Sequence, residues 1–104
     1  MKRGEIRWAE HPDWPRRPAL ILTHDEAIDH LNAVFVVVAT TNIRDLGTEV
    51  ELGTEDGMPR PCVLNADNTA TIAKSYLRQP ITTISSTKLR EVCKPTRPMD
   101  ASRT

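Results

Sequence analysis

Two short apolar segments limit the folds that this chain can adopt. Residues 18–22 read Pro-Ala-Leu-Ile-Leu, and residues 34–39 read Val-Phe-Val-Val-Val-Ala. The second segment is rich in β-branched side chains, which favour strands. Continuous apolar runs of this length are typical of central strands covered on both faces, whereas half-exposed strands alternate in character. The sequence therefore predicts two neighbouring strands at the centre of a sheet.

Polar residues stand at one end of each apolar segment. Arg16 and Arg17 precede the first segment, and Thr40, Thr41 and Asn42 follow the second. If the two strands pair in antiparallel fashion, the start of one lies beside the end of the other. These five side chains would then share one small patch. Guanidinium groups, hydroxyls and an amide together are suited to binding an anion.

The whole sequence predicts a mainly β domain with a few short helices. Apolar runs, alternation and turn residues place strands at 4–10, 18–24, 34–42, 48–52, 62–72 and 81–84. Short helical segments are expected at 25–31 and 74–77, and a last helix between Ser85 or Ser86 and Pro95. Strands that do not alternate regularly with helices favour a small, strongly bent antiparallel barrel.

Composition restricts the possible functions. The 104 residues carry 14 Lys and Arg against 14 Asp and Glu, so we expect no broad electrostatic attraction to nucleic acid. No apolar run approaches the roughly 20 residues of a membrane span and no secretion signal is evident, so we expect a cytoplasmic protein. Cys62 and Cys93 are isolated, which argues against a zinc site. We expect one domain over residues 1–95 and a flexible tail over 96–104.

Four segments have the order and spacing of a known family. They are Arg-Gly-Glu-Ile-Arg-Trp at 3–8, Arg-Pro-Ala-Leu-Ile-Leu at 17–22, Val-Val-Ala-Thr-Thr-Asn at 37–42 and Cys-Val-Leu-Asn-Ala-Asp-Asn at 62–68. On these segments the chain resembles the MazF/PemK family of type II toxin–antitoxin ribonucleases, in particular its shorter actinobacterial-type members. The resemblance implies an SH3-like or CcdB-like barrel that forms a homodimer.

The resemblance also implies an activity and a set of partners. Members of this family are toxins that cut single-stranded RNA at selected sequences by attack of the 2′-hydroxyl. They need no metal ion and no other cofactor. A cognate antitoxin neutralises them, and operator DNA is a further candidate partner of the toxin–antitoxin complex.

Matching the motifs assigns roles to particular residues. The family's catalytic arginine falls on Arg17 and its catalytic threonine on Thr40, while the pair that approaches RNA bases falls on Asp67 and Asn68. An arginine fork matches phosphate oxygens and stays charged, so Arg17 is expected to stabilise the transition state. Thr40 is expected to donate a hydrogen bond to the same phosphate. A turn or bulge explains Asp67 and Asn68 equally well.

Further residues near the patch are candidates for RNA binding or proton transfer. The additional candidate RNA contacts are Arg16, Trp14, Thr41 and Asn42. Trp14 is expected either to stack on an unpaired base or to contact a partner chain. His11 and Asp13 are candidate acid–base residues, since the 10–16 loop has no clear equivalent of the family's usual glutamate. Trp8, which alternates with Ile6, is expected in the core.

Two alternatives to the ribonuclease remain open on the sequence. The first is a non-catalytic toxin that, like CcdB, binds DNA gyrase, for which Arg17 and Thr40 have no required role. The second is an inactive relative that only binds an antitoxin or takes part in DNA autoregulation. Cleavage of RNA by the purified protein separates both from the ribonuclease.

Overall fold

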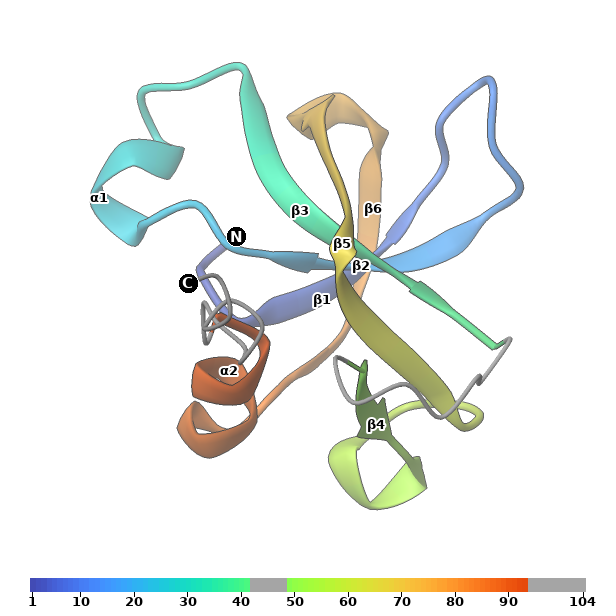
Figure 1. The fold of residues 1–104 in the computed structure, drawn as a ribbon. Coiled ribbons are helices and arrows are strands. Elements are labelled where there is room, and N and C mark those ends of the chain that lie inside the picture. Colours follow the sequence, from blue (N-terminus) through green and yellow to red (C-terminus); the bar gives the residue numbers. More distant parts are fainter. Residues whose placement is uncertain (42–48, 94–104) are drawn as a thin grey trace, which may run out of the picture.

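The computed structural model describes residues 1–41 and 49–93. Within them, six strands form one antiparallel sheet in the order β4-β5-β3-β2-β1-β6 (Figure 1). The strands are β1 (Glu5–Ala9), β2 (Arg17–Ile21), β3 (Ala33–Thr40), β4 (Glu49–Leu52), β5 (Cys62–Ala73) and β6 (Leu77–Thr83). The helices are α1 (Asp25–Ile28), α2 (Ser86–Cys93) and the single turns η1 (Thr54–Asp56) and η2 (Lys74–Tyr76).

The two continuous apolar segments form the central strands β2 and β3, as predicted. They pair in antiparallel fashion, with Ala19 opposite Val38 and Ile21 opposite Val36. Successive residues of a strand point to opposite faces. Two buried clusters result, one containing Leu20 and Val37 and the other containing Ala19, Ile21, Val36 and Val38. Both faces of these strands are therefore covered, which explains why their sequences do not alternate.

The sheet is bent, and its two edge strands do not meet. Strand β3 pairs with the second half of β5 at Ala33–Ala73 and with the first half at Thr40–Val63, with a register shift between Val37 and Ala39. Among the described residues, no pairing joins the edge strands β4 and β6. The mainly antiparallel architecture with few short helices is confirmed, but the sheet is not closed into a barrel.

Strand β6 is longer than the sequence predicts. It begins at Leu77 rather than at residue 81, because Leu77 pairs with Ala9 and Pro80 pairs with Arg7 of β1. Its residues 78–80 are exposed and polar or proline, so they carry no apolar strand signal. The segment belongs to an edge of the sheet, where exposed polar residues and proline are common.

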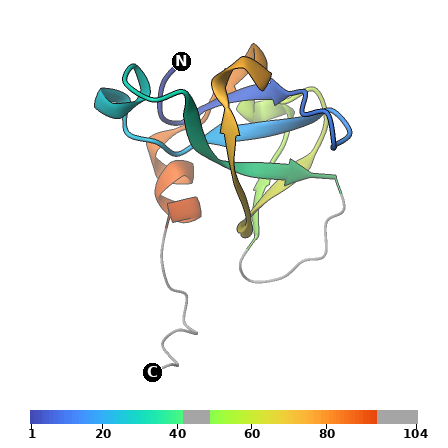
Figure 2. The same ribbon diagram turned by 90° about the horizontal axis from the view of Figure 1, so that it is seen from above.

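The helices and the first loop lie on opposite sides of the molecule. In two perpendicular views, α1 and α2 lie at one end of the molecule and the loop between β1 and β2 lies at the other (Figures 1 and 2). Ile28 of α1 and Val92 of α2 belong to different buried clusters, so the two helices pack on opposite faces of the sheet. No helix of the described part is long and apolar enough to cross a membrane. The expected tail at 96–104 and the expected helix stop at Pro95 lie outside the described residues.

Candidate functional site

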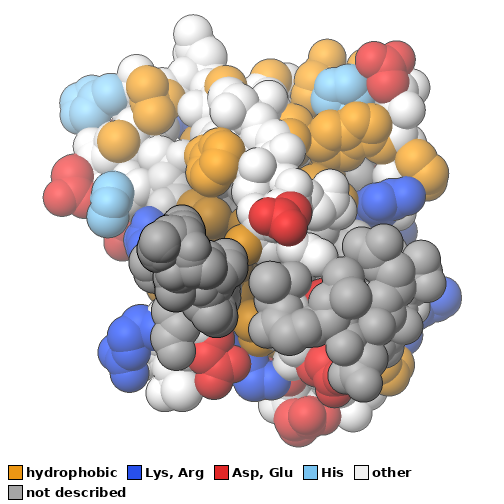
Figure 3. All heavy atoms as spheres, in the orientation of Figure 1, with side chains coloured by type: hydrophobic (Ala, Val, Ile, Leu, Met, Phe, Trp, Pro, Cys, Tyr) orange, Lys and Arg blue, Asp and Glu red, His pale blue; other side chains and the backbone are white. Residues whose placement is uncertain are grey.

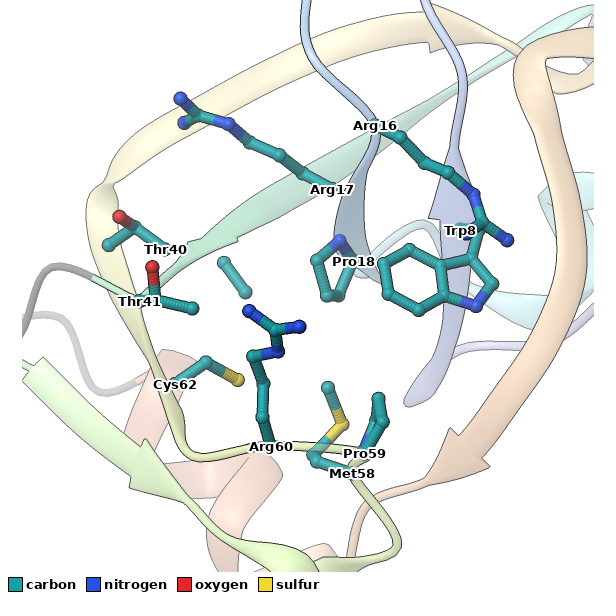
Figure 4. A pocket seen from close by; sticks show the side chains of 11 residues that line it. Trp8, Arg16, Arg17, Pro18, Thr40, Thr41, Met58, Pro59, Arg60 and Cys62 are labelled. Atoms are coloured by element: carbon teal, nitrogen blue, oxygen red, sulfur yellow. The ribbon is translucent and has the colours of Figure 1, made fainter.

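A cavity of about 550 Å³ lies where β2 begins and β3 ends. Strand β2 starts at Arg17, β3 stops at Thr40, and a loop before β5 forms the opposite wall (Figure 4). The lining residues are Trp8, Arg16, Arg17, Pro18, Ala39, Thr40, Thr41, Met58, Pro59, Arg60 and Cys62.

Antiparallel pairing brings four of the predicted site residues into this cavity. Since Ala19 stands opposite Val38, the start of β2 and the end of β3 reach the same end of the sheet. Arg16, Arg17, Thr40 and Thr41 all line the cavity, as the sequence patch requires. Figure 4 shows the hydroxyls of Thr40 and Thr41 on the same side as the Arg17 guanidinium. Asn42 lies outside the described residues.

The two adjacent arginines have different surroundings. The Arg16 guanidinium lies 4.1 Å from the centroid of the Trp8 ring, and its Nε donates to Glu10 Oε2 at 3.1 Å. Glu10 also pairs with Arg78 at 3.3 Å. Arg17 makes no ion pair or side-chain hydrogen bond with the residues described. Of the two, Arg17 is the cation available to a bound anion.

Sequence reasoning missed the second wall of the cavity. Arg60 points its guanidinium into the cavity from a loop that carries no strand or helix signal (Figure 4). Trp8 was expected in the core, but it is half-buried and lines the cavity opposite Pro18, its partner in β2. The position of Arg60 between Pro59 and Pro61 is the signal that the sequence offers, because proline restricts the backbone on both sides of such a residue.

The candidate acid–base residues do not line the cavity. The His11 ring stacks on Trp14 with a centroid distance of 4.5 Å and meets the edge of Tyr76 at 5.0 Å. The backbone N–H of Asp13 donates to His11 Nδ1 at 3.0 Å. This cluster lies in the loop between β1 and β2, and one face of the Trp14 ring is covered by His11. The remaining surface of Trp14 packs partly against the buried cluster that contains Ala19 and Val36.

Asp67 and Asn68 lie in the irregular part of β5. Val37 pairs with Thr69 whereas Ala39 pairs with Leu64, so residues 65–68 form a bulge opposite Val38. The backbone N–H of Asp67 donates to Asn65 Oδ1 at 2.9 Å, and Asn68 Nδ2 donates to the Val38 carbonyl at 3.0 Å. Neither residue lines the cavity, but Val38 directly precedes the lining residue Ala39 in β3.

The lining favours an anion and not a cysteine nucleophile. Among the described residues that line the cavity there are three arginines and no Asp, Glu or His. Burial raises the pKa of the Cys62 thiol above its ordinary value, and the Asp56 carboxylate adds to that effect. The thiol therefore stays protonated near neutral pH and is a poor nucleophile. No group of three or more metal-ligating side chains is found in residues 1–41 and 49–93.

The face shown in Figure 3 has no continuous basic patch among its described residues. On this face, Lys and Arg side chains are separated by acidic and uncharged ones, in keeping with a formal net charge of zero. This face therefore offers little net electrostatic attraction to an anionic ligand. The arginine-lined cavity is the part of the described surface that selects an anion by shape and hydrogen bonding.

Comparisons with known proteins identify relatives of this chain. A model of the PemK-like, MazF-like toxins of type II toxin–antitoxin systems matches residues 2–97. A Mycobacterium tuberculosis protein named as a probable endoribonuclease MazF2 is 40% identical over 94 residues, covering 89% of this chain and 91% of that protein. A probable endoribonuclease MazF5 of the same species is 33% identical over 92 residues, covering 88% and 84%.

Solved structures share the fold. The Mycobacterium tuberculosis toxin MazF-mt6 superposes with a TM-score of 0.78 at 32% identity, covering 86% of this chain and 89% of that chain. A mycobacterial endoribonuclease solved in complex with its cognate antitoxin has the same TM-score of 0.78 at 24% identity, covering 89% and 87%. At that lower identity the second likeness concerns the fold alone.

Proposed function

We propose a function from the following premise: this chain belongs to the PemK-like, MazF-like toxin family of type II toxin–antitoxin systems. It is the toxin of such a system and an endoribonuclease, as its relatives are named. It cuts single-stranded RNA at selected sequences without a metal ion. The observation that carries this function is the cavity in which Arg17 and Thr40 meet at the ends of two paired strands.

The chemistry uses the RNA's own 2′-hydroxyl as the nucleophile. When that oxygen is aligned with the adjacent phosphorus, the P–O bond to the 5′-oxygen of the next nucleotide breaks and a 2′,3′-cyclic phosphate forms. Negative charge grows on the non-bridging oxygens in the transition state, and preorganised donors lower the barrier. Solvent water takes up the proton of the attacking 2′-hydroxyl and supplies a proton to the leaving 5′-oxygen. Arg17 stays charged, neutralises the growing charge and donates hydrogen bonds that help the leaving oxygen to be protonated, while the Thr40 hydroxyl donates a hydrogen bond to the phosphate.

The remaining site residues bind the RNA around the cut. Arg16 and Thr41 line the same cavity as Arg17, and Asp67 and Asn68 present polar edges beside it, where Watson–Crick groups of unpaired bases can be read. Trp14 contributes through stacking once RNA displaces His11 from its ring. Asn42 is proposed as a further RNA contact on the sequence alone.

The protein acts in the cytoplasm, where a cognate antitoxin holds it inactive. Within this proposal, residues 1–95 are the toxin domain. We further propose a homodimer as the active species and operator DNA as a target of the toxin–antitoxin complex. The named endoribonuclease relatives support cleavage over the gyrase-binding alternative, since the family match spans residues 2–97 and includes both Arg17 and Thr40.

The test is cleavage of a long single-stranded RNA in EDTA. Wild type is expected to cut at a few defined positions and to leave 2′,3′-cyclic phosphate ends, and Arg17→Ala is expected to lose the activity. Arg90→Ala, at an exposed position on α2 outside the cavity, is the matched control. Cutting that persists in Arg17→Ala would remove Arg17 from the mechanism. A folded wild type that cuts no RNA but inhibits DNA supercoiling would establish the gyrase-binding toxin.

A further inference from the structure

We propose that Arg60 is a second phosphate-binding residue, which holds the RNA backbone one or more nucleotides away from the phosphate bound by Arg17. This inference rests on the proposed function for its ligand, single-stranded RNA. The proposal gives a role in phosphate binding to the second wall of the cavity, the loop that carries Arg60, which lies outside the family motifs found in the sequence.

The loop that carries Arg60 is anchored on both sides. Met58 is 3% exposed and Cys62 is 2% exposed, so the chain enters and leaves the protein interior within two residues of Arg60. Pro59 and Pro61 restrict the backbone between these anchors. An arginine whose backbone is fixed in this way loses less conformational freedom on binding than one in an unrestrained loop.

A hydrogen-bond network fixes the turn before Arg60. Asp56 Oδ2 accepts a hydrogen bond from the Gly53 N–H at 2.9 Å and lies 3.3 Å from Lys88 Nζ on α2. The Thr82 hydroxyl of β6 donates to the Asp56 carbonyl at 2.9 Å. Gly57 then turns the chain with a φ of +94°, a conformation that other residues rarely adopt. The network ties the loop to α2 and to β6.

The charge of Arg60 is not used within the described structure. Its side chain makes no ion pair or hydrogen bond with residues 1–41 or 49–93, and it is exposed at the cavity wall. In Figure 4 its guanidinium enters the cavity from the loop side, while Arg17 stands on the strand side. RNA carries a phosphate at every nucleotide, so a strand that crosses the cavity presents successive anions to the two arginines. In this proposal each arginine binds the phosphate nearest its own wall.

The first test measures binding without cleavage. A fluorescein-labelled, mixed-sequence 12-nucleotide 2′-O-methyl RNA, which lacks the nucleophile, is titrated with protein at several salt concentrations. Arg60→Ala is expected to weaken binding by about tenfold. It is also expected to reduce the slope of log affinity against log salt by about 0.7, the value for one lost phosphate contact on a single strand. Arg60→Lys, which keeps the charge but loses the fork, is expected to retain the slope and part of the affinity.

Arg90→Ala serves as the control, because this exposed arginine on α2 does not line the cavity. Its affinity and salt slope are expected to equal those of wild type. An Arg60→Ala variant that behaves like Arg90→Ala would overturn the second phosphate site. Thermal unfolding of each variant establishes that the loop and the fold are intact, which is expected because Arg60 is exposed.

The second test separates Arg60 from Arg17 by kinetics. With a cleavable RNA, Arg60→Ala is expected to raise KM about tenfold with kcat unchanged, because it removes binding that is equal in the ground and transition states. Arg17→Ala is expected to lower kcat. Wild type that binds the 2′-O-methyl RNA through Arg60 but cuts no RNA would remove the ribonuclease function and keep the phosphate site. If wild type cuts RNA but Arg60→Ala changes neither KM nor the salt slope, the ribonuclease function stands and the second phosphate site is removed.

Discussion

The guanidinium of Arg16 lies over the ring of Trp8, 4.1 Å from its centroid, and is held there by an ion pair with Glu10 at 3.1 Å. The next residue, Arg17, has neither contact within the described structure. Two arginines adjacent in sequence thus differ in their freedom: Arg16 is held against the cavity wall and is proposed to contact RNA beside the cut, whereas Arg17 is available to the phosphate that is cut. This difference makes their substitutions distinguishable.

Replacing each arginine by alanine should have unequal effects on cleavage. Arg17→Ala is expected to lower kcat by about 10²–10³-fold, the cost of removing a preorganised donor to the transition state. Arg16→Ala is expected to change kcat by less than about tenfold, since a half-exposed ion pair and a cation–π contact are each worth about 1 kcal/mol or less. Single-turnover cleavage of one RNA measures both. Equal losses in the two variants would contradict the division of roles.

The hydroxyl of Thr40 can be removed without changing the shape of the side chain. Thr40→Val is expected to lower kcat by about ten- to hundredfold, because a hydrogen bond to a charged phosphate is lost. Valine is a good strand residue, so β3 should persist. Thr40→Ser keeps the hydroxyl and should retain most of the activity. If Val and Ser variants cleave equally well, the hydroxyl has no part in the reaction.

His11 offers a test of acid–base catalysis. Its ring stacks on Trp14 and does not line the cavity. We expect His11→Ala to lower kcat/KM by less than about tenfold and to leave the shape of its pH profile unchanged, since general acid–base residues contribute about 10²–10⁴-fold. If His11→Ala instead lowered kcat/KM by more than about tenfold and removed one limb of its pH profile, His11 would be a catalytic residue that movement of the loop brings to the RNA.

Asp56 should make stability depend on acidity. The Gly53 N–H that donates to Asp56, together with the Lys88 ammonium, holds the pKa of this carboxyl below its ordinary value of 3.8 in spite of partial burial. The unfolded chain therefore takes up this proton more readily than the folded one. The stabilisation is fully present above pH 3.8 and is lost as the pH falls through the lower folded pKa.

Urea unfolding of wild type and Asp56→Asn measures this dependence. At pH 7 the variant is expected to unfold with a free energy lower by about 1 kcal/mol or less, because the amide oxygen still accepts from the Gly53 N–H while the negative charge and the ion pair with Lys88 are lost. The difference in free energy of unfolding between wild type and Asp56→Asn should become smaller as the pH falls below 3.8. Glu55→Gln, at an exposed carboxyl one residue away, is the control and should show no such difference. A difference that is constant down to the acid transition would show that charge is not the cause.

The central strands and the first wall of the site could be predicted from the sequence because their signals are local. Continuous apolar character identified β2 and β3, and antiparallel pairing then joined Arg17 to Thr40. The MazF/PemK resemblance, now confirmed by the family match, supplied the chemistry that those residues alone did not specify.

The second wall could not be predicted, because its position depends on contacts distant in sequence. Arg60 lies in a loop whose preceding turn is held by the contacts of Asp56 with Lys88 and Thr82, both distant in sequence. Trp8 alternates with the buried Ile6 and therefore resembles a core residue. The regular pairing of β1 with β2 instead places Trp8 beside Pro18, near the start of β2, where both residues line the cavity.

The tie between Asp56 and Lys88 has a consequence for the synthesis of the protein. A ribosome makes the chain from its amino terminus, and Lys88 lies in the last described helix. The loop that carries Arg60 is therefore fastened only after nearly all of the domain has emerged. A partly made chain holds Arg17 and Thr40 before the opposite wall is fixed, so the two walls proposed to bind RNA come together only after α2 has been synthesised.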